Sequence, residues 1–162
     1  MTLKSSRFFI MEITKVPHEV LTKKALEVPI EEIKAGEHAR LISDMKKAMF
    51  EHEGVGLAAN QIGKDLAVFV IDIKTADAYK VPEAYFNPEI TEYSPETELM
   101  EEGCLSIPGY YFEIKRSKKV MLKAVNEHGE KIKIKARGFL ARVFQHETDH
   151  LNGKTIKDRA NG

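Results

Sequence analysis

The segment from Gly138 to Leu151 constrains this chain most. Its apolar residues recur at helical spacing, and Asn152-Gly153 directly after it is a common helix stop. Successive helical residues are about 100° apart, so His146 and His150 lie within about 40° of each other on one face. Two imidazoles buried on an apolar face without partners are costly. The helix therefore needs a fold that brings a polar group or a metal ion to its histidines.

The rest of the chain has the pattern of a mixed fold. A helix is predicted from Glu37 to Glu53 with Gly54 as its stop, and buried strands from Leu66 to Ile73 and from Tyr85 to Ile90, where Pro88 indicates an edge or a bulge. Lys118–Val125 and Lys131–Lys135 flank a turn and predict a hairpin with its isoleucines facing the core. Strands followed by a helix that carries polar groups inward indicate the α+β class.

Composition excludes several classes of protein. The chain has 162 residues, the length of one domain, and its 25 basic and 25 acidic residues give no support to nucleic-acid binding. No apolar run approaches the ~20 residues of a membrane span, and residues 1–10 lack the features of a signal peptide. Cys104 is the only cysteine, which rules out an intramolecular disulfide. Met11 is an alternative start that would make residues 1–10 an N-terminal extension.

The sequence His146-Glu147-Thr148-Asp149-His150 has the spacing of a metal-binding helix. Glu147 lies about 60–100° around from the histidines, where it can reach water at the metal without being a ligand. Phe139 and Val143 share the histidine stripe and would give the site an apolar floor, which strengthens the field of an ion. Arg142 is placed about 60–100° from that stripe and receives no role.

Cys104 offers a third ligand. A lone cysteine is more often a small buried hydrophobic residue. This one follows Gly103 in a non-helical stretch, where backbone can approach a site closely. One thiolate and two imidazoles leave a fourth position for water, which is typical of a catalytic metal. These ligand types suit zinc as well as iron, so the residues alone do not choose the ion.

The segment Gly54–Gln61 is a strip of small residues that ends in an amide. A phosphate-binding loop is disfavoured, because the third glycine is missing and a helix precedes the strip. A plain turn and a backbone strip that pairs with an extended ligand both remain open. In the second case, Gln61 could stabilise an oxyanion that develops on a carbonyl beside the metal.

Together these three segments resemble the peptide deformylases, which have GxGxAAxQ, EGCxS and HExDH motifs in this order. Here the motifs are Gly54–Gln61, Glu102–Ser106 and His146–His150, and the similarity runs from about Glu12 to Arg159. The resemblance implies a single catalytic domain over residues 1–162, with antiparallel sheets packed around a central helix that carries the HExDH motif. It implies hydrolysis of the formyl group from the N-terminal formylmethionine of nascent polypeptides, with release of formate.

The resemblance also implies a role for individual residues. Cys104, His146 and His150 would bind the metal, which is iron(II) (Fe2+) in the cell, with nickel, cobalt or zinc as substitutes. Glu147 would be general base and then general acid. Gln61 and the backbone N–H of Leu105 would hold the formyl oxygen. The residues expected to bind the methionine end of the substrate are Val55, Gly56, Gly103, Leu105, Phe139 and Val143.

Glu102 and Asp149 have two interpretations of equal weight. Ligand imidazoles usually donate their second N–H to a carboxylate or carbonyl, so both acids could orient the histidines. They could instead form structural ion pairs, with Arg116 as a partner.

Two other functions remain as alternatives. An HExxH metallopeptidase would cut internal peptide bonds, but such enzymes do not use cysteine as third ligand. A non-catalytic metal- or peptide-binding relative would not need Glu147 and Gln61. The expected partners are N-formylmethionyl nascent peptides in the cytoplasm, with an organellar or phage origin left open. Direct ribosome docking is not expected, because longer bacterial members continue past the motif helix and this chain stops at Gly162.

Overall fold

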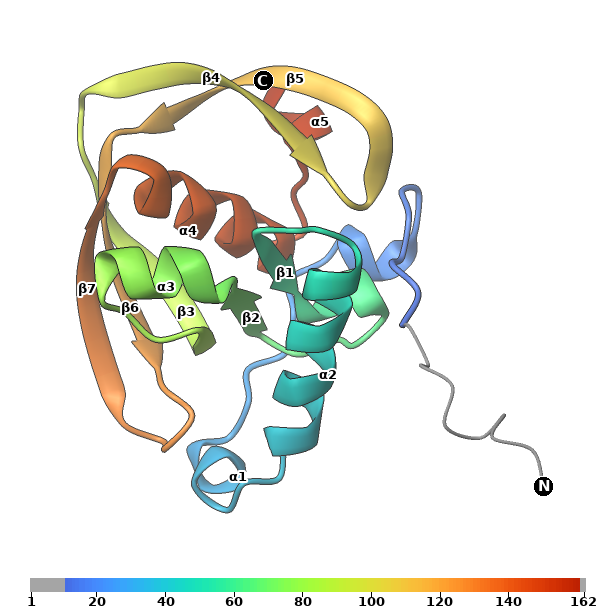
Figure 1. Cartoon of the computed structure of the whole chain (residues 1–162), viewed down its shortest axis with the longest axis vertical. Coiled ribbons are helices and arrows are strands. Elements are labelled where there is room, and N and C mark those ends of the chain that lie inside the picture. Colours follow the sequence, from blue (N-terminus) through green and yellow to red (C-terminus); the bar gives the residue numbers. More distant parts are fainter. Residues whose placement is uncertain (1–10, 161–162) are drawn as a thin grey trace.

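Helix α4 (Gly138–Leu151) lies between two antiparallel sheets in the computed structural model, which describes residues 11–160 (Figure 1). The larger sheet has the strand order β1-β2-β3-β6-β7, and the smaller consists of β4 and β5 alone. The strands are β1 (Gly56–Ala58), β2 (Val68–Ile71), β3 (Ala84–Tyr93), β4 (Thr97–Cys104), β5 (Ile107–Ser117), β6 (Lys119–Val125) and β7 (Lys131–Arg137). The arrangement agrees with the α+β class expected from the sequence.

Shorter helices surround this frame. They are α1 (Ile30–Lys34), α2 (Ala39–Glu51), α3 (Ile73–Tyr79) and α5 (Ile156–Ala160), with 3-10 turns η2 (Glu19–Leu21) and η3 (Ala59–Ile62). No helix in the described residues is long and apolar enough to cross a membrane.

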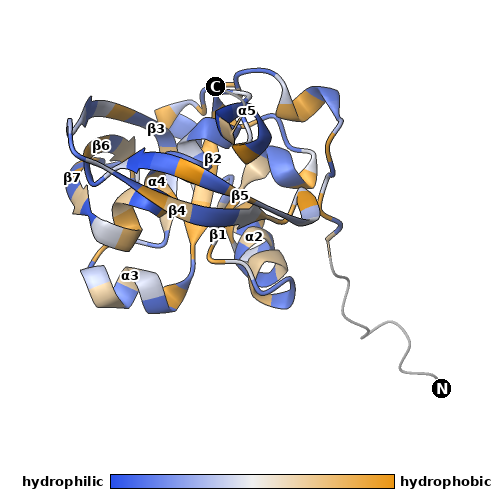
Figure 2. Cartoon of the chain, turned by 90° about the horizontal axis from the view of Figure 1, so that it is seen from above, coloured by the Kyte–Doolittle hydropathy of each residue, from blue (hydrophilic) through white to orange (hydrophobic). Residues whose placement is uncertain are grey.

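The buried strand β2 separates two halves of the core. Val68 and Val70 pack in the cluster that contains the apolar face of α2, whereas Phe69 and Ile71 pack in the cluster that contains α4. Since both faces are covered, all four residues of β2 are apolar and buried, and the strand stands out as hydrophobic in Figure 2.

Most predicted elements are present, with shifted boundaries. The predicted hairpin is formed by β6 and β7, and the predicted motif helix is α4, which ends before Gly153 at a φ of 78°. Helix α2 is two residues shorter at each end than the predicted Glu37–Glu53, and Glu53, not Gly54, takes the left-handed conformation, with a φ of 58°. Gly54 N–H then donates to Met49 O, which closes the helix end.

One prediction about strands was wrong, and two others are made more specific by the structure. The strand expected to reach Ile73 stops at Ile71, because the side chain of Asp72 accepts from Thr75 N at 3.1 Å and starts α3. Pro88 lies at a bulge and not at an edge, since β3 has neighbours on both sides and its register shifts between Phe86 and Glu89. The stretch around Cys104 was expected only to be non-helical, and it is the end of β4.

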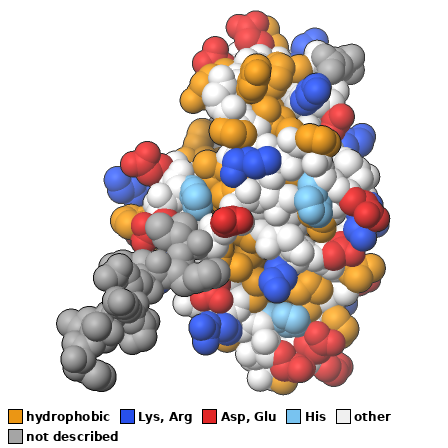
Figure 3. Space-filling model, turned by 90° about the vertical axis from the view of Figure 1, so that its right-hand side faces the viewer, with side chains coloured by type: hydrophobic (Ala, Val, Ile, Leu, Met, Phe, Trp, Pro, Cys, Tyr) orange, Lys and Arg blue, Asp and Glu red, His pale blue; other side chains and the backbone are white. Residues whose placement is uncertain are grey.

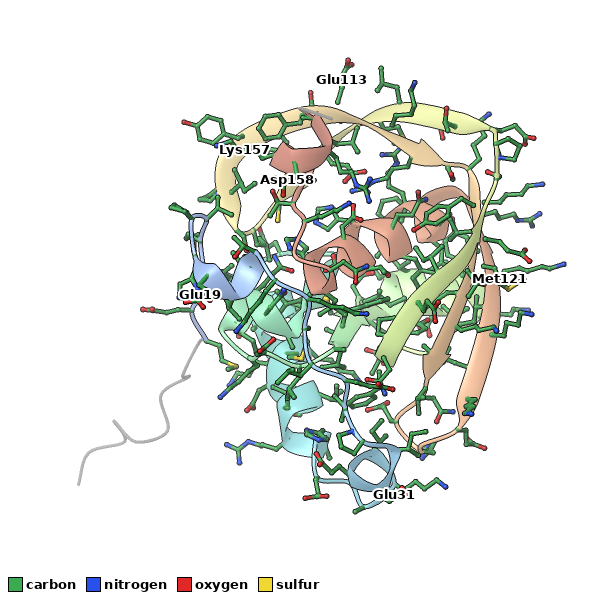
Figure 4. All side chains as sticks on the ribbon, turned by 180° about the vertical axis from the view of Figure 1, so that it is seen from behind. Glu19, Glu31, Glu113, Met121, Lys157 and Asp158 are labelled. Atoms are coloured by element: carbon green, nitrogen blue, oxygen red, sulfur yellow. The ribbon has the colours of Figure 1, made fainter. Side chains whose placement is uncertain are left out.

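In the part of the chain that the structure describes, no strand of the β4–β5 hairpin pairs with a strand of the larger sheet. Ile107 and Ile114 of the hairpin pack against Ile156 of α5. In Figure 4, the labelled Lys157 and Asp158 mark α5 beside the hairpin, and Glu113 projects away from the molecule. Cys104 ends β4, so its position relative to α4 depends on side-chain contacts and not on strand pairing.

An aromatic cluster fastens α4 to the larger sheet. The Phe144 ring lies edge-on to Tyr85 with ring centroids 5.0 Å apart, and 5.9 Å from Phe69. Phe144 is 0% exposed, whereas Phe50 on α2 is 81% exposed.

We expect Phe144→Ala to lower the free energy of unfolding by about 3–5 kcal/mol, because it opens a cavity beneath α4. Phe50→Ala is the control and should change it by less than about 0.5 kcal/mol. Urea unfolding measures both, and equal effects would contradict this account of the core.

Candidate metal centre

Three potential metal ligands converge from two elements. Cys104 comes from the end of β4, and His146 and His150 lie one turn apart on α4. Their ligand atoms all lie within 4.8 Å of one another, and Cys104 Sγ is 3.2 Å from His150 Nε2. No second group of three such ligands is found within residues 11–160.

The donor set fits a divalent ion. Metal–sulfur and metal–nitrogen bonds of about 2.0–2.3 Å allow a thiolate and an imidazole of this separation to share one ion. Burial lowers the pKa of His150 well below its ordinary value, so its imidazole is neutral and has a lone pair to offer. Three protein ligands leave the fourth position free, as in catalytic sites.

Glu102 orients one of the ligand histidines. His146 Nδ1 lies 2.9 Å from Glu102 Oε1, and the carboxylate also accepts two bonds of 3.0 Å from Arg116. Burial would raise the pKa of Glu102, but the hydrogen bonds from His146 and Arg116 outweigh it and hold that pKa below its usual range. Because Nδ1 of His146 faces this carboxylate, Nε2 is the ring nitrogen that can face an ion.

Asp149 fits the second interpretation offered from the sequence, that of a structural ion pair. Its carboxylate accepts from Arg116 Nη1 at 2.5 Å and from Arg159 Nη2 at 2.6 Å. It thus forms structural ion pairs, while Glu102 combines both predicted roles.

Glu147 is buried beside the ligands without a partner for one oxygen. Its Oε1 is fully buried and has no hydrogen bond. Burial raises the pKa of Glu147 to about 7. A carboxyl group of that pKa can accept and release a proton at neutral pH.

Gln61 is held in place by its amide oxygen. That oxygen accepts from Ala58 N at 3.0 Å, and Gln61 Nε2 lies 3.2 Å from Ser106 Oγ and 3.7 Å from Cys104 Sγ. Its N–H donors therefore face the ligand side of the site. Leu105 follows Cys104 in the turn between β4 and β5.

A cavity of about 640 Å³ opens beside these groups. Its lining includes Gln61, Cys104, His146 and Glu147, and all six residues expected to bind substrate: Val55, Gly56, Gly103, Leu105, Phe139 and Val143. Strand β1, which contains Gly56, is the last strand of its sheet, and no strand within the described residues pairs with its second edge.

Exposed apolar side chains border this region. The β4–β5 hairpin exposes Leu99, Met100, Tyr110 and Tyr111, and the last three line the cavity. Figure 3 shows hydrophobic side chains gathered at the end of the molecule where this hairpin lies. Such a surface is typical of a binding cleft.

Comparison with known proteins identifies the family. Residues 10–162 match the family model described as polypeptide deformylase. This chain belongs to the peptide deformylase family. A peptide deformylase of Aquifex aeolicus is 45% identical over 156 residues, which cover 94% of this chain and 89% of the relative.

Solved structures agree. The crystal structure of the Thermotoga maritima peptide deformylase has a TM-score of 0.83 and 42% identity, and the match covers 94% of this chain and 98% of that one. The actinonin-bound Acinetobacter baumannii enzyme has a TM-score of 0.83 at 32% identity, over 94% and 99% of the two chains. Membership of the deformylase family confirms the resemblance drawn from the three motifs, and it favours that function over the two alternatives.

Arg142 was not among the site residues predicted from the sequence. This residue is buried, lines the cavity and donates to Glu102 Oε2. Arg142 and His146 are four residues apart, and such residues lie within about 40° of each other on a helix. This spacing could have placed Arg142 beside His146 from the sequence alone. The prediction that Arg142 lies about 60–100° from the histidine stripe was wrong.

The deformylase motif glycine Gly56 makes room for Glu147. A Cβ atom at residue 56 would lie 2.6 Å from Glu147 Oε2. Gly56→Ala should therefore displace the carboxylate and lower kcat/KM on a formyl peptide by at least about 100-fold, the lower end for general acid–base loss. The three ligands are untouched, so metal content should not change.

Gly54→Ala is the matched control for this prediction. Its Cβ would press only on the end of the flexible Leu105 side chain, at 3.0 Å, and would lie at ordinary contact distance from Gly56 O and Met49 Cγ, at 3.5 and 3.6 Å. We expect activity within a few-fold of the wild type. Full activity in Gly56→Ala would contradict the proposed position of Glu147.

Proposed function

We propose that this chain removes the formyl group from the N-terminal formylmethionine of nascent polypeptides, with iron(II) held by Cys104, His146 and His150. The observation that carries the proposal is the placement of buried Glu147 beside three ligand atoms that lie within 4.8 Å of one another. The proposal covers residues 1–162 as one catalytic domain in the cytoplasm.

The proposed metal ion supplies charge to the reaction, and its identity comes from the family resemblance. When bound, it polarises the formyl carbonyl and makes water more acidic. Iron(II) is the ion that the family resemblance implies, and nickel, cobalt or zinc would occupy the same ligands. A reducing compartment suits the thiolate of Cys104, because exposed thiolates oxidise readily.

Glu147 carries the proton through the reaction. It accepts a proton from the attacking water as the oxygen bonds to the formyl carbon. It then delivers this proton to the methionine nitrogen as the C–N bond breaks. The products are formate and a peptide with a free methionine amine. A pKa near 7 makes both transfers accessible to the same carboxyl group.

Gln61 and Leu105 stabilise the oxygen of the formyl group. Negative charge grows on this oxygen as water attacks, and donors that are already oriented need no rearrangement. The bond from Ala58 N and the contact with Ser106 hold the Gln61 amide before substrate arrives. The backbone N–H of Leu105 is the proposed second donor.

The peptide is proposed to lie against the open edge of β1. An extended chain can add to such an edge through main-chain hydrogen bonds and place alternate side chains in pockets. The methionine side chain then enters the apolar part of the cavity at Val55, Gly103, Phe139 and Val143. No role for nucleic acid or membrane is proposed.

The decisive experiment is formate release from formyl-Met-Ala-Ser. The protein is purified anaerobically, a nickel-loaded sample is run beside it, and acetyl-Met-Ala-Ser is the control substrate. Formate from the formyl peptide alone is expected. Cleavage at an internal bond would favour a peptidase, and bound metal without any product would favour a binding protein.

The role of Glu147 has its own test. Glu147→Gln should bind metal normally and lose turnover by about 10²–10⁴-fold, because the amide cannot accept a proton from water. Glu101→Gln is the control, since Glu101 lines the same cavity and is exposed. Turnover of Glu147→Gln within tenfold of the wild type would remove Glu147 from the mechanism.

A further inference from the structure

Arg142 joins helix α4 to both strands of the β4–β5 hairpin. Its Nη1 donates to Glu102 Oε2 at 2.5 Å and to Ile114 O at 3.1 Å, and its Nη2 donates to Glu98 O at 2.7 Å. Glu98 and Glu102 belong to β4 and Ile114 to β5. One guanidinium thus fixes the helix of the two histidines against the strand that ends in Cys104.

Arg116 also reaches α4, through Asp149, but it does not tie Glu102 to that helix. Arg116 and Glu102 both belong to the hairpin, so their paired hydrogen bonds move with it. Arg142 lies on α4, one turn before His146. Two side chains of α4 therefore contact the Glu102 carboxylate: Arg142 bonds to Oε2 and His146 bonds to Oε1.

Stability alone does not account for an arginine at this position. Arg142 is 6% exposed. Burying a charge removes its hydration, and replacing a buried ion pair by well-packed apolar residues is often neutral or stabilising. Apolar side chains in place of the whole charged network could therefore hold α4 against the hairpin as well. The distinguishing property of arginine is its rigid fork of donors, which sets direction as well as distance.

We propose that Arg142 is a positioning residue for the metal centre, which orients the Glu102 carboxylate toward His146 and sets the separation between Cys104 and the two histidines. This inference rests on the proposed function, because it takes these three residues as the metal ligands. Arg142 acts through Glu102 and touches no reacting atom.

Two substitutions test the proposal in the full chain loaded with cobalt(II). Arg142→Met keeps much of the side-chain volume and removes every donor, while Arg142→Lys keeps the charge and removes the fork. The measurements are the rate of cobalt loss to excess EDTA and the visible spectrum of the cobalt-thiolate centre. Changes to groups that orient metal ligands commonly cost 10–100-fold in metal affinity. We expect Arg142→Met to lose cobalt at least about tenfold faster and to shift the spectrum, with Arg142→Lys between it and the wild type.

Arg159→Met is the matched control. Arg159 also pairs with a carboxylate on α4, but that carboxylate is Asp149, which holds no ligand histidine. This variant should unfold at a lower temperature and keep the cobalt spectrum and release rate of the wild type.

The outcomes distinguish a failure of the positioning role of Arg142 from a failure of the proposed function. Release within twofold of the wild type in Arg142→Lys, with an unchanged spectrum, would overturn the positioning role even if stability falls. Should Arg142→Met fail to fold, Arg142→Lys alone decides. Failure of the wild-type chain to bind cobalt would overturn the proposed function and this inference with it.

Discussion

The buried carboxylate of Glu102 is the interaction on which the site depends. Its two oxygens accept hydrogen bonds from Arg116, Arg142 and His146, which come from β5 and α4. An isolated charge in this place would be unstable, so the carboxylate, the guanidinium groups and the imidazole are tolerated only together. Because the hairpin is not paired with the larger sheet, this network and the small apolar cluster around Ile156 bring Cys104 to the helix.

The apolar side of α4 provides the second support. Phe144 packs on Tyr85 and Phe69 of the larger sheet, while the opposite side of the helix presents its histidines to the hairpin. One helix therefore divides a dry core from a polar centre. The burial that stabilises the fold also raises the pKa of Glu147 to about 7, which suits it to proton transfer.

The unpaired edge of β1 is the proposed place for the peptide substrate. Among residues 11–160, strand β1 has a strand partner on one side only, and Gly56 carries no side chain that could displace Glu147 from the cavity. An extended peptide along this edge would present its first residue to the metal ligands. Residues of α4 line the cavity, so a peptide on this edge would meet the helix that carries the two histidines.

The sequence alone determined the motif helix, the β6–β7 hairpin, the α+β class and the convergence of Cys104, His146 and His150, because helical spacing, strand alternation and motif order are local or family properties. It did not reveal β4, the contacts of Arg142 or the choice between the two interpretations of Glu102. Those depend on contacts between residues far apart in the chain, such as Arg142 with Glu98 and Glu102. Only the tertiary structure decides which helix face a hairpin covers, because that choice reflects the combined packing of side chains from α4, β5 and α5.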